Sequence, residues 1–377
     1  MKLSSLKASR YHSLRDVTVD VRDLNLFIGT NASGKSSILD ALRFLQEGVQ
    51  ERDFREPVTS RGGVLHLAWK GEDAHQIHLK INVVEECQEY EWSVLLTRDK
   101  YEFFIREELY EVHSNSPPTQ LLSSERGMGW WWSGEKQQGV QMKQIPTGCA
   151  LAAAAADATF PARRIAEFVG GWGFFDPNPF SLRRSWPGIE SSRLDGYGRN
   201  LAERLYALEK SSPETFRQIV SATQSVLGLP TEIEPRETEE GRFYFAQKEP
   251  GLRHWVHQIG ASSGTLRMLA LMTALFGEAG SNLVGVEEPE NHVHPTALAA
   301  FADYLLKAKE KVQILVTTHS PLLLDFLNEP TAVFIVQRDD EQGTRVVPEN
   351  NPQGVAQALE ASGFGLGEFY ETKGFGG

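Results

Sequence analysis

The chain has 377 residues, of which 41% are hydrophobic and 23% are charged, with a net charge of −12 at pH 7. These values are typical of a globular protein that forms one large domain with an insertion, or two lobes. The acidic balance argues against a protein whose whole surface binds nucleic acid, although a local basic groove is compatible with it.

Cysteine content and hydropathy indicate the compartment. Cys87 and Cys149 are the two cysteines of the chain, so no disulfide framework is expected and a reducing environment fits. The first residues have no apolar segment of signal-peptide length, and the most apolar run, residues 150–156, is far shorter than a membrane span. The sequence therefore predicts a soluble cytoplasmic protein without membrane contact.

A phosphate-binding loop is the strongest local signal. Residues 29–37 fit the pattern G-x-x-x-x-G-K-[ST], between an apolar run at 24–28 and a helical periodicity from Ile38 to Leu45. This order of strand, loop and helix lets backbone N–H groups and the helix N-terminus point at phosphate oxygens. Lys35 is expected to reach the β- and γ-phosphates, and Ser36 to hold Mg²⁺. The predicted nucleotide-binding residues are Gly29, Thr30, Asn31, Ala32, Ser33, Gly34, Lys35, Ser36 and Ser37.

The N-terminal segments around this loop read as strands. Residues 1–8 and 14–28 are predicted to form two strands, the second of which leads into the phosphate loop. From Ile77 to Ile105 apolar residues alternate with polar ones, which predicts an antiparallel meander with one buried face.

Regular periodicity is lost over residues 114–148, so a linker or surface arm is expected there. Trp130, Trp131 and Trp132 cannot all face one core from a strand. They suggest either a docking point for a partner or packing against the base of the arm, and the second interpretation is favoured. The following stretch, 160–199, is rich in arginine and aromatic residues; because acids are interspersed, it is interpreted as a solvated face. Two helices are predicted next, over 201–208 and 213–226.

An acid pair ends a second apolar strand. Residues 283–286 are apolar and are followed by Glu287, Glu288, Pro289 and Glu290. Two carboxylates at the end of a buried strand are costly unless they meet a metal ion or a polarised water. In phosphoryl transfer one acid holds Mg²⁺ and the next one orients or deprotonates the attacking water. Glu287 is therefore assigned to the metal and Glu288 to the water.

A histidine and a small-residue segment complete the candidate site. The apolar strand 312–317 leads to His319, at the strand end where open α/β sheets bind ligands, and His319 could donate to a γ-phosphate oxygen. Ser262, Ser263 and Gly264 precede a helix and could offer backbone amides to an anion. Taken alone, this segment is better interpreted as a simple helix N-cap, formed by Ser262 or Ser263.

The order of these motifs resembles the ATP-binding-cassette (ABC) ATPases, and within them the branch of SMC, RecF and OLD-type proteins, including small predicted AAA-type ATPases of bacterial defence systems. The resemblance is carried by the blocks 10–21 with 29–37, 262–267, 287–295 and 317–321, and by 194–196, 200–202 and 365–370. It frames nearly the whole chain and is weakest in the insertion.

The resemblance implies an α/β fold: a two-lobed ABC-type ATPase head with a mixed sheet core, flanking helices, an antiparallel meander and an inserted arm and helical region. The expected domains are 1–113, 114–255 and 256–377. ATP and Mg²⁺ are the implied cofactors. ATP would lie between two copies of the chain, with Ser263 and Gly264 of one copy closing on the γ-phosphate held by Lys35 of the other.

The implied function is that of an ATP-hydrolysing dimeric clamp or sensor. It would control an effector encoded nearby, such as a nuclease or toxin, or DNA, in antiphage defence or genome maintenance. Three alternatives stay open at this point: a scaffold that binds ATP with little turnover, a transporter subunit, and a self-contained ATPase–nuclease. The long insertion argues against a transporter subunit, and the short C-terminal remainder argues against a nuclease domain.

Two departures from the family pattern stand out. Ala32 occupies a loop position where the family has glycine, so its backbone would need a conformation that glycine enters more easily. Glu287 stands where the wider superfamily has aspartate, so its contact with Mg²⁺ is expected to be less direct.

Overall fold

The computed structural model describes residues 1–69, 76–100, 102–184, 193–251, 253–278, 280–339, 341–348 and 352–372. The chain divides into two compact units. Unit 1 comprises Met1–Arg22, Gly29–Trp172 and Phe334–Pro348, and unit 2 comprises Asp23–Ile28, Gly173–Val333 and Glu349–Gly377. The three domain ranges predicted from the sequence stay a prediction, since these units describe compactness alone.

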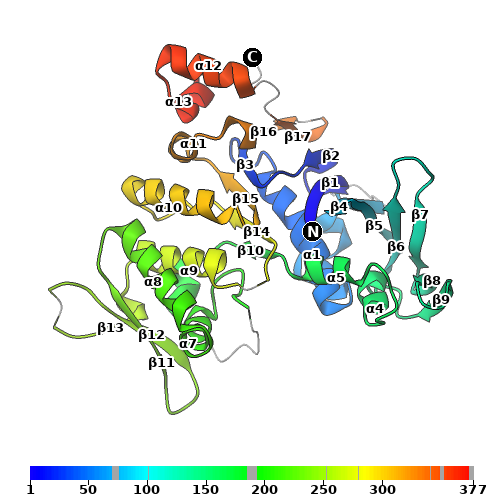
Figure 1. Cartoon of the computed structure of the whole chain (residues 1–377), viewed down its shortest axis with the longest axis horizontal. Coiled ribbons are helices and arrows are strands. Elements are labelled where there is room, and N and C mark those ends of the chain that lie inside the picture. Colours follow the sequence, from blue (N-terminus) through cyan, green and yellow to red (C-terminus); the bar gives the residue numbers. More distant parts are fainter. Residues whose placement is uncertain are drawn as a thin grey trace. The chain divides into compact units, whose positions relative to one another are not determined.

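An eight-stranded antiparallel sheet runs through unit 1 in the order β2-β1-β4-β5-β6-β7-β8-β9 (Figure 1). Its strands are β1 (Lys2–Tyr11), β2 (Leu14–Asp20), β4 (Gln76–Glu85), β5 (Gln88–Asp99), β6 (Glu102–Val112), β7 (Thr119–Glu125), β8 (Met128–Ser133) and β9 (Gln138–Lys143). The predicted meander is confirmed, because β4, β5 and β6 pair as neighbours and bury alternate residues such as Ile77, Leu79 and Ile81.

Five helices and a hairpin complete the described part of unit 1. The elements are α1 (Lys35–Glu51), α2 (Arg55–Ser60), α3 (Val64–Leu67), α4 (Ala150–Ala155), α5 (Arg163–Gly170), β16 (Val333–Asp339, whose first residue lies in unit 2) and β17 (Gly343–Pro348). As predicted, α1 follows the phosphate loop and buries its periodic apolar stripe, which includes Ile38, Leu42 and Leu45.

The prediction of one strand over residues 14–28 is wrong. β2 ends at Asp20, and a separate strand, β3 (Leu24–Ile28), begins four residues later in unit 2. The burial patterns differ: β2 buries alternate residues, as a strand with one covered face does, whereas β3 is buried throughout. A strand covered on both faces and one covered on a single face belong to different sheets.

The prediction of an irregular arm over 114–148 is also wrong, since β7, β8 and β9 lie there. Their alternation is hidden in the sequence because Ser, Gly and Gln occupy many strand positions. Of the three adjacent tryptophans only Trp131 is fully buried, and its ring lies 5.8 Å from that of Phe160. Trp130 and Trp132 are half-buried, as expected for neighbours that point to the opposite face of a strand.

Unit 2 is built on parallel strands. β10 (Gly173–Phe175), β14 (Leu283–Glu287), β15 (Gln313–Thr318) and β3 pair in that order. A separate three-stranded antiparallel sheet consists of β11 (Glu232–Glu237), β12 (Phe243–Lys248) and β13 (Val256–His257). The α/β fold class predicted from the sequence is confirmed.

Helices surround these strands, and α8, α9 and α10 pack against one another (Figure 1). The predicted helices at 201–208 and 213–226 are confirmed as α7 and α8. The helices are α6 (Pro179–Leu182), α7 (Leu201–Ser211), α8 (Pro213–Leu227), α9 (Ser263–Phe276), α10 (Pro295–Ala308), α11 (Pro321–Leu327), α12 (Pro352–Ser362) and α13 (Leu366–Glu371), with the 3₁₀ turns η2 (Gln258–Gly260) and η3 (Pro330–Ala332).

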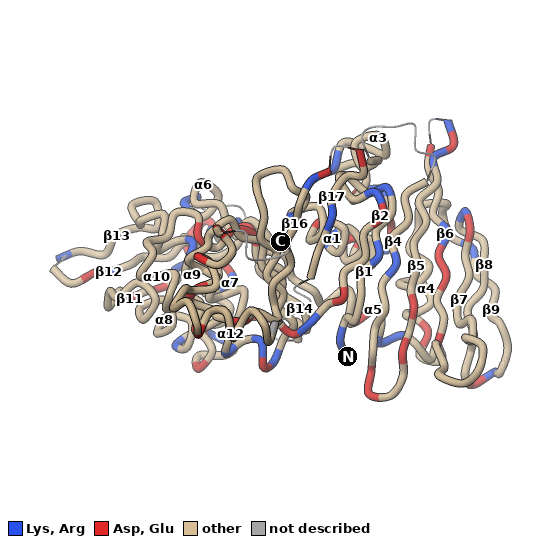
Figure 2. Tube along the Cα trace, turned by 90° about the horizontal axis from the view of Figure 1, so that it is seen from above, with Lys and Arg blue, Asp and Glu red and all other residues tan. Residues whose placement is uncertain are grey.

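Acidic and basic residues are interspersed along the trace of both units (Figure 2). In the part of the chain that the structure describes, no helix combines the length and apolarity that a membrane crossing requires.

A buried carboxylate joins the meander of unit 1 to α4. Glu107 on β6 is 1% exposed, and it accepts hydrogen bonds from the backbone N–H groups of Ala150 and Leu151 and from Nε1 of Trp92. Burial raises the pKa of Glu107 from the ordinary 4.5 to about 7, and these donors limit the rise.

We expect Glu107 to make folding pH-dependent. Because its pKa is higher in the folded state, its contribution to stability is full below about pH 4.5 and is lost as the pH rises through 7. The difference between the two pKa values corresponds to a fall of about 3 kcal/mol in the free energy of unfolding. Urea denaturation at pH 5, 6, 7 and 8 should show this fall in the wild type and not in Glu107→Gln. Glu108→Gln, at the adjacent surface ion pair with Arg106, should keep it. Equal slopes in all three proteins would contradict the assignment.

Candidate functional site

The phosphate loop lies in unit 1 between the end of β3 and the start of α1. Lys35 is 4% exposed, and its Nζ donates to the carbonyl oxygens of Gly29 at 2.9 Å and Thr30 at 3.0 Å. Ala32 and Gly34 both have positive φ angles, 61° and 109°. The expectation that Ala32 needs a conformation favoured by glycine is therefore confirmed.

The loop is supported by two segments distant in sequence. Thr344 on β17 donates through Oγ1 to the carbonyl oxygen of Ser33 (2.8 Å). Its Oγ1 also lies 2.7 Å from Oγ of Ser13, which lies 3.0 Å from Oγ of Ser37, so the three hydroxyls form a hydrogen-bonded chain. A Cβ at Gly34 would lie 2.0 Å from Oγ1 of Thr344, so only glycine fits there. Sequence reasoning gave no role to Ser13, which lies in the block 10–21, or to Thr344, which lies in no motif.

The other loop residues differ in exposure. Thr30, Asn31 and Ser36 are exposed, so Ser36 Oγ is accessible at the start of α1. Oγ of the buried Ser33 has no hydrogen-bond partner among the described residues.

The acid pair ends β14 in unit 2. Glu287 is its last residue, and Glu288 follows with a φ of 44°, a left-handed conformation rare for a residue with a side chain. The Glu288 backbone N–H donates to the carbonyl oxygen of Thr317 at 2.9 Å. This bond ties the acid pair to the end of β15.

Both carboxylate oxygens of Glu288 are held. Nε2 of His319 lies 3.1 Å from Oε1, and Nδ2 of Asn291 donates to Oε2 at 2.7 Å. Glu290 fixes the loop that carries His319: its Oε1 accepts from the His319 backbone N–H (2.7 Å) and from Oγ1 of Thr318 (2.8 Å). The pairing of Glu288 with His319 puts together two residues singled out from the sequence. The roles of Glu290 and Asn291 were missed, although both lie in the same motif.

The register of the parallel strands places these residues at one edge of the sheet. Glu287 of β14 pairs with Thr317 of β15, and Thr318 pairs with Ile28 of β3. Parallel strands end at the same edge, which is where open α/β sheets bind ligands. Along the chain, Ile28 is followed directly by Gly29, the first residue of the phosphate loop.

The Ser-Ser-Gly segment caps α9. Oγ of Ser262 accepts from the Thr265 backbone N–H at 3.0 Å, so the N-cap interpretation is correct for Ser262. Ser263 is the first helical residue, and its Oγ accepts from Nη2 of Arg183 at 3.0 Å. A Cβ at Gly264 would lie 3.1 Å from the carbonyl oxygen of His292, so α9 approaches the loop after the acid pair closely.

A buried arginine joins the Ser-Ser-Gly helix to the acid pair. Arg267 on α9 is 2% exposed, and its Nη2 donates to the carbonyl oxygens of Glu287 and Glu288, each at 2.9 Å. The same guanidinium donates to the carbonyl oxygen of Pro177 and lies 3.3 Å from Oδ1 of Asp176. Arg267 thereby connects α9 to the backbone of the acid pair.

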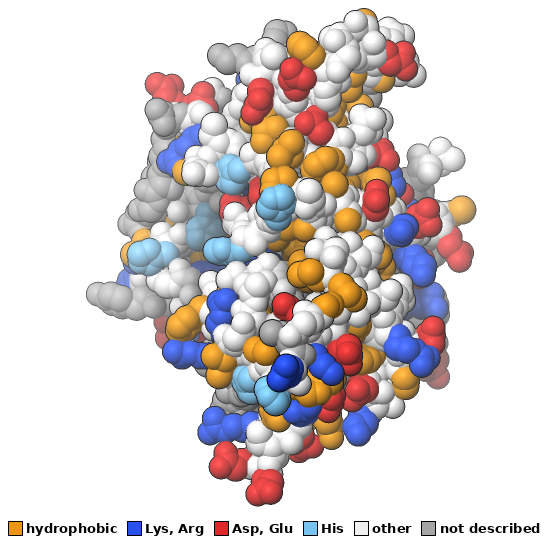
Figure 3. Space-filling view, turned by 90° about the vertical axis from the view of Figure 1, so that its left-hand side faces the viewer, with side chains coloured by type: hydrophobic (Ala, Val, Ile, Leu, Met, Phe, Trp, Pro, Cys, Tyr) orange, Lys and Arg blue, Asp and Glu red, His pale blue; other side chains and the backbone are white. Residues whose placement is uncertain are grey.

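Several histidine side chains gather on one face of the molecule, next to apolar ones (Figure 3). Of the described histidines in unit 2, His292 and His294 follow β14 and His319 follows β15. Nδ1 of His294 accepts from the Thr296 backbone N–H and so caps α10, which gives His294 a structural role.

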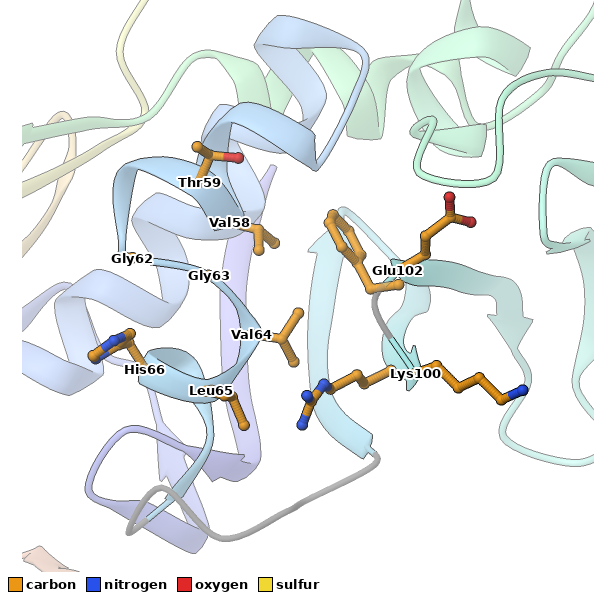
Figure 4. Close-up of a pocket in the computed structure, with 11 residues that line it drawn as sticks. Val58, Thr59, Gly62, Gly63, Val64, Leu65, His66, Lys100 and Glu102 are labelled. Atoms are coloured by element: carbon orange, nitrogen blue, oxygen red, sulfur yellow. The ribbon is translucent and has the colours of Figure 1, made fainter.

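Unit 1 also has a cavity of about 360 Å³ away from the motif residues. Val58, Val64 and Leu65 line it on the helical side, and Lys100 and Glu102 on the strand side (Figure 4). None of the candidate nucleotide-binding, catalytic or metal-binding residues predicted from the sequence lines this cavity.

Two family models match the chain. Residues 1–116 match the family described as "AAA ATPase domain", and residues 186–325 match that described as "AAA domain, putative AbiEii toxin, Type IV TA system". No curated protein sequence matches at a significant level.

Solved structures of SMC heads share the fold. The SMC head domain from Thermotoga maritima is 15% identical, with a TM-score of 0.50 over 92% of this chain and 99% of that one. An SMC head bound to the C-terminal winged-helix domain of ScpA is 13% identical, with a TM-score of 0.60 over 94% and 100% of the two chains. An SMC head with an extended coiled coil, bound to the C-terminal domain of ScpA from Pyrococcus furiosus, is 11% identical, with a TM-score of 0.55 over 95% and 99%.

At these identities the structural likeness concerns the fold, while the two family matches concern the sequence. Residues 1–116 and 186–325 are thus similar in sequence to AAA-type ATPase domains, and the chain has the fold of SMC heads.

Proposed function

We propose that the protein hydrolyses ATP to ADP and phosphate and uses this reaction to open and close a dimer of the chain. The observation that carries the proposal is the arrangement around Glu288. Its carboxylate is held by His319 and Asn291 at the end of β14, in the sheet whose strand β3 leads directly into the phosphate loop.

The phosphate loop suits a nucleotide triphosphate. Ala32 and Gly34 have left-handed backbone, a conformation from which backbone N–H groups can form an anion-binding nest for phosphate oxygens. Lys35 holds its ammonium group against the loop carbonyls of Gly29 and Thr30, from which it can turn to the β- and γ-phosphates. We assign ATP binding to residues 29–37.

Glu288 is assigned as the group that accepts a proton from the attacking water. Its fixed carboxylate suits this role, because a general base must point at the proton that it removes. His319 lies at hydrogen-bond distance from Glu288 and is assigned to bind the γ-phosphate. It would thereby hold both the Glu288 carboxylate and the γ-phosphate in position.

Oxygen ligands are what Mg²⁺ prefers, and the Ser36 hydroxyl and the Glu287 carboxylate are the groups assigned to it. When bound, the ion would neutralise charge on the β- and γ-phosphate oxygens. Glu287 stays in position through the bond from Arg267 to its backbone carbonyl.

The second half of the proposal concerns assembly. Ser262, Ser263 and Gly264 at the start of α9 would close on the γ-phosphate of a second copy, as the family resemblance implies. The SMC heads that share this fold include two bound to domains of ScpA, which supports a partner protein for this chain as well. We propose that this partner is an effector protein, such as a nuclease or toxin, or DNA. The protein would act in the cytoplasm, in antiphage defence or genome maintenance.

Glu288→Gln tests the proposal. Without the proton acceptor, turnover should fall about 100- to 10,000-fold while ATP still binds. The variant should then accumulate as an ATP-bound dimer with twice the 42.1 kDa mass of the chain, measured by light scattering after size exclusion. Glu310→Gln, at an exposed position, is the matched control and should behave as the wild type. If Glu288→Gln stays monomeric in saturating ATP, the proposal that ATP closes a dimer of the chain is wrong.

A further inference from the structure

Arg183 touches the start of α9 from the arginine-rich insertion. Its Nη2 donates to Oγ of Ser263 at 3.0 Å and to the carbonyl oxygen of Ala261 at 3.1 Å. Nε2 of Gln258 donates to the carbonyl oxygens of Leu182 (3.0 Å) and Arg184 (3.2 Å), on both sides of Arg183. The chain around Arg183 is therefore anchored to the segment that precedes α9.

The charge of Arg183 is not neutralised within the part of the chain that the structure describes, where its acceptors are a hydroxyl and a carbonyl and no carboxylate lies within 4.0 Å. Neighbouring arginines of the insertion differ. Arg199 pairs with Asp195 at 2.7 Å, and Arg193 lies 3.7 Å from a carboxylate oxygen of Glu278. A guanidinium that has only neutral acceptors keeps its capacity to bind an anion.

Its surroundings favour a phosphate group. Ser263 is the first residue of α9, a 14-residue helix, and the N-terminus of such a helix attracts anions through its free N–H groups and its dipole. Guanidinium groups match the geometry of phosphate oxygens better than ammonium groups do. A hydroxyl, a helix N-terminus and a cation thus converge at the same point.

We propose that Arg183 binds the γ-phosphate of the ATP held by the phosphate loop of a second copy, beside Ser263. The inference rests on the proposed function, which requires Ser263 to meet that phosphate. Arg183 neutralises charge that spreads over the γ-phosphate oxygens during hydrolysis, and such stabilisation acts chiefly on the rate of the chemical step. The insertion thereby makes the rate depend on the partner copy.

Three variants test the role. Arg183→Ala should lower kcat at least about 100-fold and change KM less than about threefold, because the nucleotide is bound mainly by the other copy. Arg183→Lys keeps the charge and should recover activity to within about tenfold of the wild type. Arg184→Ala is the matched control: its exposed guanidinium lies over the ring of Phe180, 4.2 Å from the centroid, and kcat should not change. Thermal melting of each variant separates lost folding from lost chemistry.

A mixing experiment decides between a role in the partner's site and a role in the chain's own site. Lys35→Ala has a defective loop and an intact Arg183, whereas Arg183→Ala has the opposite combination. A mixed dimer contains one site with an intact loop from one copy and an intact Arg183 from the other. Each mixed dimer therefore has one working site of two. Because random mixing in equal amounts makes about half of the dimers mixed, turnover should rise to about a quarter of that of the wild type.

The possible results have distinct meanings. Restored turnover on mixing supports Arg183, and no gain on mixing overturns its role in the partner's site. If the wild type is active and Arg183→Ala hydrolyses ATP at the same rate, the assignment of Arg183 is wrong while the proposed function stands. If the wild type itself neither hydrolyses ATP nor forms a dimer, the proposed function is wrong, and so is the role assigned to Arg183.

Discussion

Replacing Lys35 by alanine is expected to weaken ATP binding at least about 100-fold, since each charge-assisted hydrogen bond to phosphate is worth about 1.5–3 kcal/mol. In the free protein the buried ammonium group of Lys35 contacts two loop carbonyls, those of Gly29 and Thr30. Those carbonyls hold it next to the loop, so little conformational entropy is lost when it turns to the phosphates. Titration with a fluorescent ATP analogue measures the change.

Lys143→Ala is the control for Lys35→Ala, because Lys143 is an exposed lysine on the edge strand β9 of the same unit. It should bind the nucleotide as the wild type does. If Lys35→Ala bound ATP with unchanged affinity, residues 29–37 would not be the nucleotide site, whatever their pattern.

Replacing Arg267 by alanine is expected to lower the free energy of unfolding by about 3 to 5 kcal/mol, the range found when one partner of a buried charged contact is removed. The buried guanidinium donates to three backbone carbonyls, those of Pro177, Glu287 and Glu288. Without it these carbonyls lose their donor, and α9 is no longer fastened to the acid pair. Turnover should fall with stability, because Glu288 then loses its position.

Chemical denaturation measures the loss of stability, and ATP turnover is measured well below the melting temperature. Arg217→Ala serves as the control, because Arg217 lies on the surface of α8 and pairs with the exposed Glu214. Exposed pairs contribute at most about 1 kcal/mol. A similar small change in Arg267→Ala would mean that the acid pair is positioned by other contacts.

Much of the site could be predicted because its chemistry is local in sequence. Nine consecutive residues form the phosphate loop, and the conformation of Ala32 follows from the need for left-handed backbone in such a loop. Glu288 and His319 each follow an apolar strand, and strand ends are where polar side chains can reach a ligand. Their 3.1 Å contact agrees with that logic.

Other parts of the fold could not be read from local patterns. Residues 14–28 look like one strand, yet the chain leaves one sheet after Asp20 and enters another at Leu24. Strands β7 to β9 carry Ser, Gly and Gln at positions where apolar residues would signal a strand. These strands are stabilised by backbone hydrogen bonds to their neighbours in the sheet and by the burial of Trp131. Neither contribution requires that every second residue be apolar.

By itself, then, the sequence determined the candidate motifs: a predicted nucleotide loop, an acid pair, a histidine and a small-residue helix start, each defined by neighbouring residues. Only the tertiary structure decided which distant groups support them. Thr344 reaches Ser33 from 311 residues away, and Arg183 reaches Ser263 from 80. Such contacts depend on which strands pair and which helices pack. These choices are made by burial over the whole chain, and a local pattern does not contain them.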